Sequence, residues 1–241
     1  MKTSSTFAEI EKEFFQRLTR CGWSASAVID VGGSNGAWSR TLADVLPDCR
    51  FDLFEPLASR DPEYATILKN LCDDQTQFIL HEVALGATAG TQQFWKQPWA
   101  VGSSLLARNA PPDEIIEVSV ARLDDYREQH GIPQPQLIKI DVQGGELLVL
   151  EGGRQTAALA DALHIETWLG RGYGKQTPLL PDVMDFLRPL DHVLVQLGEY
   201  WRKPDQELFV VDAFFVHRRL IDQIASAGCE YPWPQNWTPD A

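Results

Sequence analysis

The segment that best suits chemistry is Asp30-Val-Gly32-Gly33-Ser34-Asn35-Gly36, which follows the apolar run AVIDV. Glycines let the backbone turn sharply with positive φ and let a ligand approach the main chain without a Cβ in the way. A helix is expected to begin here, so its free N–H groups are available to a carboxylate or phosphate. A GxGxxG pattern fails, because Ser34 and Ala37 stand where its later glycines belong. We interpret the segment as a cofactor-binding turn, the alternative being a tight turn without a ligand.

A carboxylate follows the next expected strand, where Glu55 stands near the end of FDLFEP. An acid at this place can accept two hydrogen bonds from the vicinal hydroxyls of a ribose. Such a contact does not distinguish one adenosine-bearing cofactor from another. The alternative is a solvated loop carboxylate.

A third informative run is LIKIDVQGGELLVLEGG, from Leu137 to Gly153. Lys139 and Asp141 are two positions apart, so they share one face of the expected strand. Asp141 falls at the carboxyl end of that strand, where open α/β sheets place their ligands. Its alternative role is to cap the helix that starts near Gly145.

Glu166 is the second candidate for catalysis, because it shares a strand face with His164 and lies nearer the carboxyl end. His192 precedes its strand and His217 follows the last one, so both are expected at the opposite end of the sheet. His81 closes the third strand, where it either contacts the cofactor or is structural.

Alternating strands and helices position these residues. Seven principal strands are expected at 27–31, 51–54, 77–80, 137–142, 163–167, 193–197 and 208–216, with helices at 6–20, 37–46, 62–71, from 145 and at 180–187. Two shorter strands, at 91–95 and 115–120, flank an irregular loop. This order predicts an α/β fold with a mostly parallel, doubly wound sheet and helices on both faces. The connection 198–207 has no room for a crossover helix, so one antiparallel strand is expected near the edge.

Length and charge limit the class of protein. The 241 residues suit one domain, with an N-terminal helix in 1–22, a core in 23–217 and a C-terminal helix and tail in 218–241. A formal net charge of −13 disfavours nucleic acid as a partner. Apolar runs are strand-sized and the first residues do not resemble a signal peptide, so we expect a cytoplasmic protein without membrane contact. Four cysteines, Cys21, Cys49, Cys72 and Cys229, form no CxxC pair and are interpreted as packing residues.

Taken together, the motifs resemble the FkbM family of methyltransferases. The matching pieces occur in the family's order over residues 27–217: VIDVGGSNG, FEP, VALG, GSSL, VARLDD, LIKIDVQGGELLVLEGG, the acid of HIET and DAFFV. The resemblance implies a Rossmann-like class I methyltransferase fold and methyl transfer from S-adenosylmethionine, typically to a hydroxyl oxygen of a small molecule or sugar. Two departures are Gly33-Ser34, where the family often has Ala-Asn, and Gln143, where it usually has Glu.

Residues and resemblance together define the expected site. The cofactor-binding set is Asp30, Gly32, Gly33, Ser34, Asn35, Gly36, Glu55, Pro56, Ala84 and Asp141. Asp141 and Glu166 are the candidate catalytic residues, which would orient a hydroxyl, act as base or hold a divalent cation. Two carboxylates are too few to predict a metal site, so none is expected.

Two other classes of protein stay open. An NAD-dependent oxidoreductase is disfavoured by the missing GxGxxG and by the late hairpin. A non-catalytic subunit would keep the cofactor fold and bind a partner.

The expected substrate is a small hydroxylated molecule. Aromatic residues among Trp95, Trp99, Trp168 and Trp201 are expected to form the wall of its pocket. The terminal YPWPQNWTPDA is either a loosely packed arm or a contact with a second copy of the chain.

Overall fold

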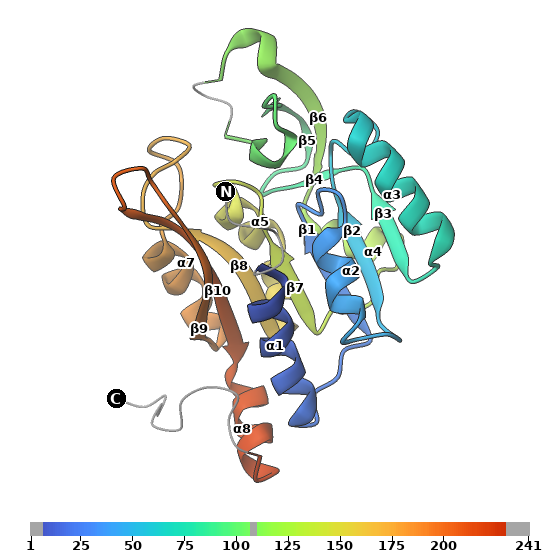
Figure 1. Ribbon diagram of the computed structural model, residues 1–241, viewed down its shortest axis with the longest axis vertical. Helices are drawn as coiled ribbons and strands as arrows, with labels where there is room; N and C mark the ends of the chain where they lie inside the picture. Colours follow the sequence, from blue (N-terminus) through green and yellow to red (C-terminus); the bar gives the residue numbers. More distant parts are fainter. Residues whose placement is uncertain (1–6, 107–109, 230–241) are drawn as a thin grey trace.

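The core of the computed structural model, which describes residues 7–106 and 110–229, is a seven-stranded sheet (Figure 1). Its strand order is β3-β2-β1-β7-β8-β10-β9. The strands are β1 (Ala27–Val31), β2 (Arg50–Phe54), β3 (Phe78–His81), β7 (Leu137–Ile140), β8 (Ala162–Trp168), β9 (His192–Arg202) and β10 (Leu208–His217). β10 runs antiparallel to β8 and β9, and the other neighbouring strands are parallel. The predicted sheet and its late antiparallel strand are confirmed.

Helices cover both faces of this sheet. One face packs against α1 (Phe7–Arg20), α2 (Ala37–Ala43), α3 (Pro62–Asp74) and α8 (Arg218–Ser226), around buried Phe14, Phe51 and Phe214. The other packs against α4 (Leu123–His130), α5 (Glu146–Gly152), α6 (Arg154–Leu159) and α7 (Leu180–Leu187), around Ile29 and Ile165. Where the sequence predicted a single helix from residue 145, the structure has two short helices, α5 and α6, which are separated by Gly153.

The two shorter strands expected at 91–95 and 115–120 are confirmed, and they pair within a small three-stranded sheet. Its strands are β4 (Ala84–Leu85), β5 (Gly90–Trp95) and β6 (Ile115–Ala121), in the order β4-β6-β5. Short 3-10 helices lie at Ala100–Gly102, Pro112–Glu114 and Arg188–Leu190. In Figure 1 this small sheet stands beyond one end of the central strands, where it extends one wall of the site described below.

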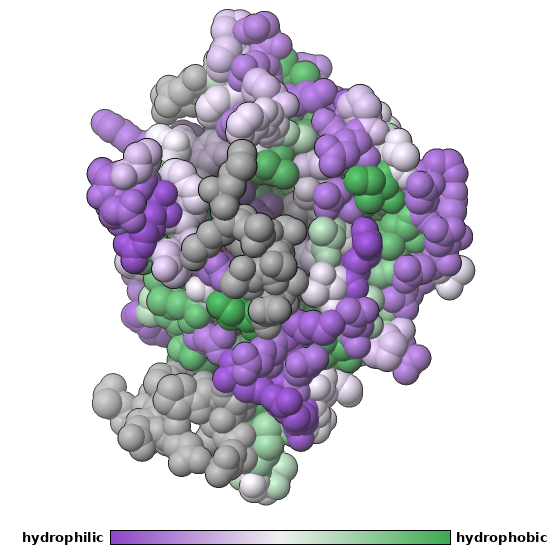
Figure 2. Space-filling model, viewed as in Figure 1, coloured by the Kyte–Doolittle hydropathy of each residue, from purple (hydrophilic) through white to green (hydrophobic). Residues whose placement is uncertain are grey.

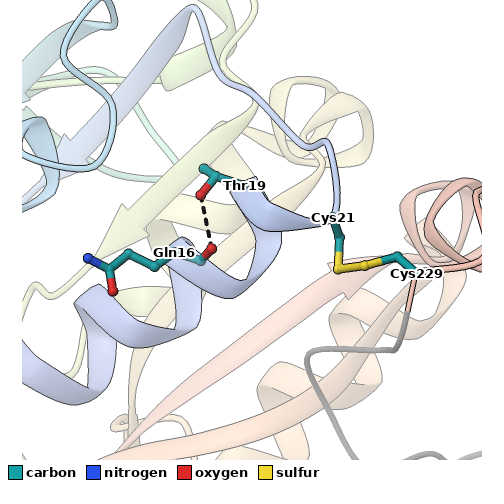
Figure 3. The surroundings of a disulfide bond; sticks show 4 residues. All are labelled: Gln16, Thr19, Cys21 and Cys229. Atoms are coloured by element: carbon teal, nitrogen blue, oxygen red, sulfur yellow. Dashed lines mark hydrogen bonds between the residues drawn. A yellow bond between two sulfur atoms is a disulfide. The ribbon is translucent and has the colours of Figure 1, made fainter.

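A disulfide joins Cys21, just after α1, to Cys229, just after α8 (Figure 3). The interpretation of all four cysteines as packing residues is wrong for this pair. The two residues are 208 positions apart, so their pairing depends on how α1 and α8 pack rather than on any local spacing. Cys49 and Cys72 are free thiols packed in or against the core.

Hydrophilic side chains cover much of the face shown in Figure 2, as the acidic composition leads one to expect. Among residues 7–106 and 110–229, no helix combines the length and the apolar character that crossing a membrane requires. The terminal segment at 231–241, interpreted as an arm or a contact between copies, lies outside the described residues.

Candidate active site

A cavity of about 1120 Å³ opens where β1, β2, β7 and β8 end. The predicted residues on its wall are Gly32, Gly33, Ser34, Asn35, Glu55, Pro56, Ala84, Asp141 and Glu166. Asp30 and Gly36 are the two predicted site residues that do not line it. The carboxyl ends of the parallel strands thus bring together residues that are far apart in the chain, as open α/β sheets do.

The turn after β1 depends on glycine at two positions. Gly32 has a φ of 78°, and a Cβ there would lie 1.9 Å from the carbonyl oxygen of Asp141. Gly36 has a φ of 75° and precedes α2, where a Cβ would lie 2.7 Å from Cδ2 of Leu71. The turn therefore lies tightly between β7 and α3, with main-chain atoms exposed to the cavity.

Asp30 lies beneath this turn and is fully buried. Its Oδ2 accepts a hydrogen bond of 2.7 Å from the Ser39 hydroxyl of α2, and its Oδ1 is 3.6 Å from Nζ of Lys139. These contacts fix the helix and the lysine to β1. Asp30 therefore supports the wall of the cavity from below.

Glu55 follows β2 and holds the turn from the opposite side. Its Oε2 accepts from the N–H of Ser34 and its Oε1 from the N–H of Leu57, both at 2.9 Å. Burial raises the pKa of Glu55 to about 7, against the opposing effect of these two hydrogen bonds. Each carboxylate oxygen has a further lone pair, so Glu55 can accept hydrogen bonds from a ligand in the cavity.

Register places a row of polar side chains across one face of the sheet. Asp30, Lys139 and His164 are paired across β1, β7 and β8, and Glu166 is paired with Asp212 across β8 and β10. Paired residues in adjacent strands project to the same face. These polar groups therefore lie under the helices on that face, next to the cavity.

Gln143 joins the two candidate catalytic carboxylates. Its Nε2 donates to Oδ1 of Asp141 at 2.9 Å and to Oε2 of Glu166 at 2.8 Å, while its Oε1 accepts from the Tyr173 hydroxyl at 3.1 Å. Lys139 also donates to Asp141, over 3.2 Å. A neutral amide can hold both acids at once, whereas the glutamate common in the family would add a third negative charge.

The two carboxylates differ in electrostatic environment. Burial, followed by the negative charges of Asp141, Glu146 and Asp212, raises the pKa of Glu166 well above its ordinary value. Burial also acts to raise the pKa of Asp141, but the Lys139 charge and the hydrogen bonds it receives outweigh it, so its pKa is lowered. The pair therefore carries its negative charge mainly on Asp141.

Several wall residues were not singled out from the sequence. Glu11 of α1 is only 7% exposed and lines the cavity, as do Gln97, Tyr173 and Asp212. A signal for Glu11 existed, since Phe14 and Phe15 stand three and four positions later and place it on the apolar face of α1. No comparable spacing marks Gln97 or Tyr173, whose loops meet only in the folded chain.

The histidines lie where the strand directions indicate. His192 contacts the Ala160 carbonyl through Nε2 at 3.2 Å, its ring lies 5.0 Å from that of His217, and neither lines the cavity. His81 has the structural role, because its Nε2 is 2.8 Å from Asp52 and its ring stacks on Phe54.

Two further alternatives are decided by the structure. Gly145, not Asp141, occupies the N-cap position of α5. Of the four tryptophans considered for the ligand end, Trp201 lines the cavity. Trp168 packs against Tyr173 and Phe209, and Trp95 donates to Glu114.

Together, the strand order, the glycine turn after β1 and the acid after β2 define a Rossmann-like methyltransferase. The model of the methyltransferase FkbM domain matches residues 30–193. The chain therefore belongs to the FkbM methyltransferase family, and it is an enzyme that uses S-adenosylmethionine as methyl donor.

Two relatives illustrate the range of similarity. The 2-O-methyltransferase NoeI of Sinorhizobium fredii is 26% identical over 167 residues, which are 63% of this chain and 67% of that protein. The crystal structure of methyltransferase FkbM from Methylobacillus flagellatus KT has a TM-score of 0.52 at 20% identity and covers 86% of this chain. This chain spans about half of that protein, 49% of its length.

Proposed function

We propose that this protein transfers a methyl group from S-adenosylmethionine to a hydroxyl oxygen of a small molecule such as a sugar. The observation that carries the proposal is the Asp141 and Glu166 pair, held by Gln143 on the wall that the glycine turn and Glu55 also line. An alcohol must lose its proton to accept a methyl group, and these carboxylates are suited to take it. The relative named as a 2-O-methyltransferase is consistent with this reaction.

The residues present fit the donor. Glu55 faces the cavity with free lone pairs for a ribose diol, and the turn at Gly32 leaves main-chain atoms open where a Cβ would collide. The sulfonium supplies an electrophilic methyl group and a neutral leaving group. The protein aligns the acceptor oxygen behind that carbon and excludes water from the cavity. We assign donor binding to the Gly32 to Asn35 turn, Glu55, Pro56 and Ala84.

The acceptor lies, in this proposal, between the carboxylate pair and the cavity mouth. Tyr173 and Trp201 line that part of the wall, and Trp201 is 55% exposed. Aromatic rings of this kind pack against the apolar faces of sugar rings while carboxylates and amides bind the hydroxyls. A small hydroxylated substrate matches this combination of surfaces.

Methyl transfer from labelled S-adenosylmethionine to a panel of sugars and phenols, with amines and carbon nucleophiles alongside, tests the proposal. Glu166→Gln should lower the rate at least about 100-fold with little change in donor affinity. The raised pKa of Glu166 makes its ionised form the stronger base of the pair, and the isosteric amide cannot accept a proton. Glu151→Gln, at an exposed position of α5, is the matched control and should behave as wild type. Transfer to nitrogen or carbon acceptors alone, or a wild-type rate for Glu166→Gln, would contradict the proposed reaction.

We also propose a cytoplasmic location. The disulfide between Cys21 and Cys229 is the observation that counts against it, since disulfides are rare in reducing compartments. Alkylating thiols in intact cells, before lysis, tests this location. Alkylation of both Cys21 and Cys229 supports the cytoplasm, and protection of both cysteines from alkylation contradicts it.

A further inference from the structure

Three side chains from three elements meet beside the carboxylate pair. Nε2 of His164, in β8, lies 3.5 Å from Oε1 of Glu11, in α1, and 3.5 Å from Oδ1 of Asp212, in β10. One possible ligand atom from each residue lies within 4.8 Å of the other two. None of the three belongs to the site expected from the sequence, where only Asp141 and Glu166 were considered for a cation.

His164 is held rigidly, yet its nitrogens lack hydrogen bonds. The residue is 1% exposed, and its ring stacks on Phe214 with centroids 4.5 Å apart and an angle of 2° between planes. Within the described part of the chain neither ring nitrogen has a hydrogen-bond partner. A buried polar group without a partner is costly, so this imidazole is the kind of group that a ligand would satisfy.

The spacing suits metal ligands better than hydrogen bonds. Hydrogen bonds from a ring nitrogen to a carboxylate span about 2.7 to 3.2 Å, shorter than either contact of His164. Ligands placed tetrahedrally at about 2.1 Å from an ion are about 3.4 Å apart. Both His164 contacts, at 3.5 Å, agree with that edge length.

We propose that Glu11, His164 and Asp212 form a binding site for a divalent transition-metal ion such as Zn²⁺. One imidazole nitrogen with two carboxylates is a ligand set that Zn²⁺ and Mn²⁺ accept, whereas Ca²⁺ requires six to eight oxygens.

The ion would lie at the wall of the cavity. Glu11 and Asp212 line the cavity, and the Asp212 side chain is 12% exposed, while His164 closes the site from the core side. Open coordination positions would therefore face the cavity, next to Glu166, which is paired with Asp212. In this part the inference rests on the proposed function: an ion here would bind the acceptor hydroxyl and lower its pKa.

Isothermal titration of chelator-treated protein with ZnCl₂, and separately with MnCl₂, tests the site. Wild-type protein should bind one equivalent of at least one ion. Glu11→Gln and Asp212→Asn should each weaken that binding at least about tenfold. Glu13→Gln is the matched control, since Glu13 is exposed on the same helix two positions away and should leave binding unchanged.

Folding and donor binding are measured for the same variants. His164→Gln risks disturbing the core, so the two carboxylate variants carry the test, with circular dichroism and S-adenosylmethionine affinity as checks on their fold. No binding of either ion by wild type, or equal binding by wild type, Glu11→Gln and Asp212→Asn, overturns the metal site. Methyl transfer by metal-free protein at the full rate would remove the ion from the reaction while leaving the proposed function intact.

Discussion

At the level of single residues, burial gives the carboxyl group of Glu55 a pKa well above that of a free glutamate. Glu55 is 6% exposed, and burial raises its pKa from 4.5 to about 7. Its two contacts with main-chain N–H groups do not fully compensate for lost hydration. The same carboxylate that positions the glycine turn therefore also makes stability depend on pH.

Between pH 4.5 and about 7 the folded protein keeps a proton on Glu55 that the unfolded chain releases. Stability from this residue is thus fully present below pH 4.5 and falls as pH rises toward 7, by a total of about 3 kcal/mol. Urea unfolding from pH 4 to 8 of wild type and Glu55→Gln isolates the effect. Their difference in free energy of unfolding should change by about that amount, and a constant difference would show that the pKa of Glu55 is the same in the folded and the unfolded chain.

The hydrogen-bond partners of Gln143 could not be predicted from its residue type. From the sequence it is known only as a departure from the glutamate that is usual in the family. In the fold it donates to both Asp141 and Glu166. Glu166 is 23 positions further along the chain, so no local spacing rule indicates that contact. Its partners follow from the meeting of β7 and β8 rather than from the run of residues around it.

Among the elements, the β1 to α2 turn is the most constrained by packing. Gly32→Ala adds a Cβ that would lie 1.9 Å from a main-chain oxygen, at a φ of 78°. We expect a loss of at least about 3 kcal/mol in stability and of donor binding, because the turn must move.

Gly131→Ala is the matched control for that variant. Gly131 also has a positive φ, 62°, but a Cβ there meets nothing within 4 Å. It should cost only about 1 kcal/mol and leave donor affinity unchanged. Equal losses of stability for both variants in thermal unfolding would contradict the close approach of β7 to the turn.

The disulfide ties the end of α1 to the end of α8, and α1 supplies Glu11 to the cavity. Cys21→Ser in oxidised protein should lower the free energy of unfolding by about 2 to 4 kcal/mol, because the open chain gains conformational freedom when unfolded. Cys72→Ser, which removes a free thiol, controls for the substitution itself. Denaturant curves for wild type and Cys21→Ser that coincide under oxidising conditions would show that the bond does not form.

At the scale of the whole molecule, local pattern was enough to predict the central sheet. The short connection between β9 and β10 indicated the antiparallel strand, and the alternation of strands and helices indicated the layers. The small sheet was not predicted as a unit, because β5 and β6 pair across a long, irregular loop. Of the cavity wall, residues at strand ends were predictable, whereas Glu11 and Asp212 joined it through packing between distant elements.

We propose that one cavity binds S-adenosylmethionine through the glycine turn and Glu55. Titration calorimetry of wild type and Glu55→Ala with S-adenosylmethionine, S-adenosylhomocysteine and NAD tests it most directly. We expect wild type to bind the first two, and Glu55→Ala to weaken binding by about 1.5 to 3 kcal/mol, roughly 10- to 150-fold. Binding of NAD alone, or equal S-adenosylmethionine affinity in both proteins, would contradict it.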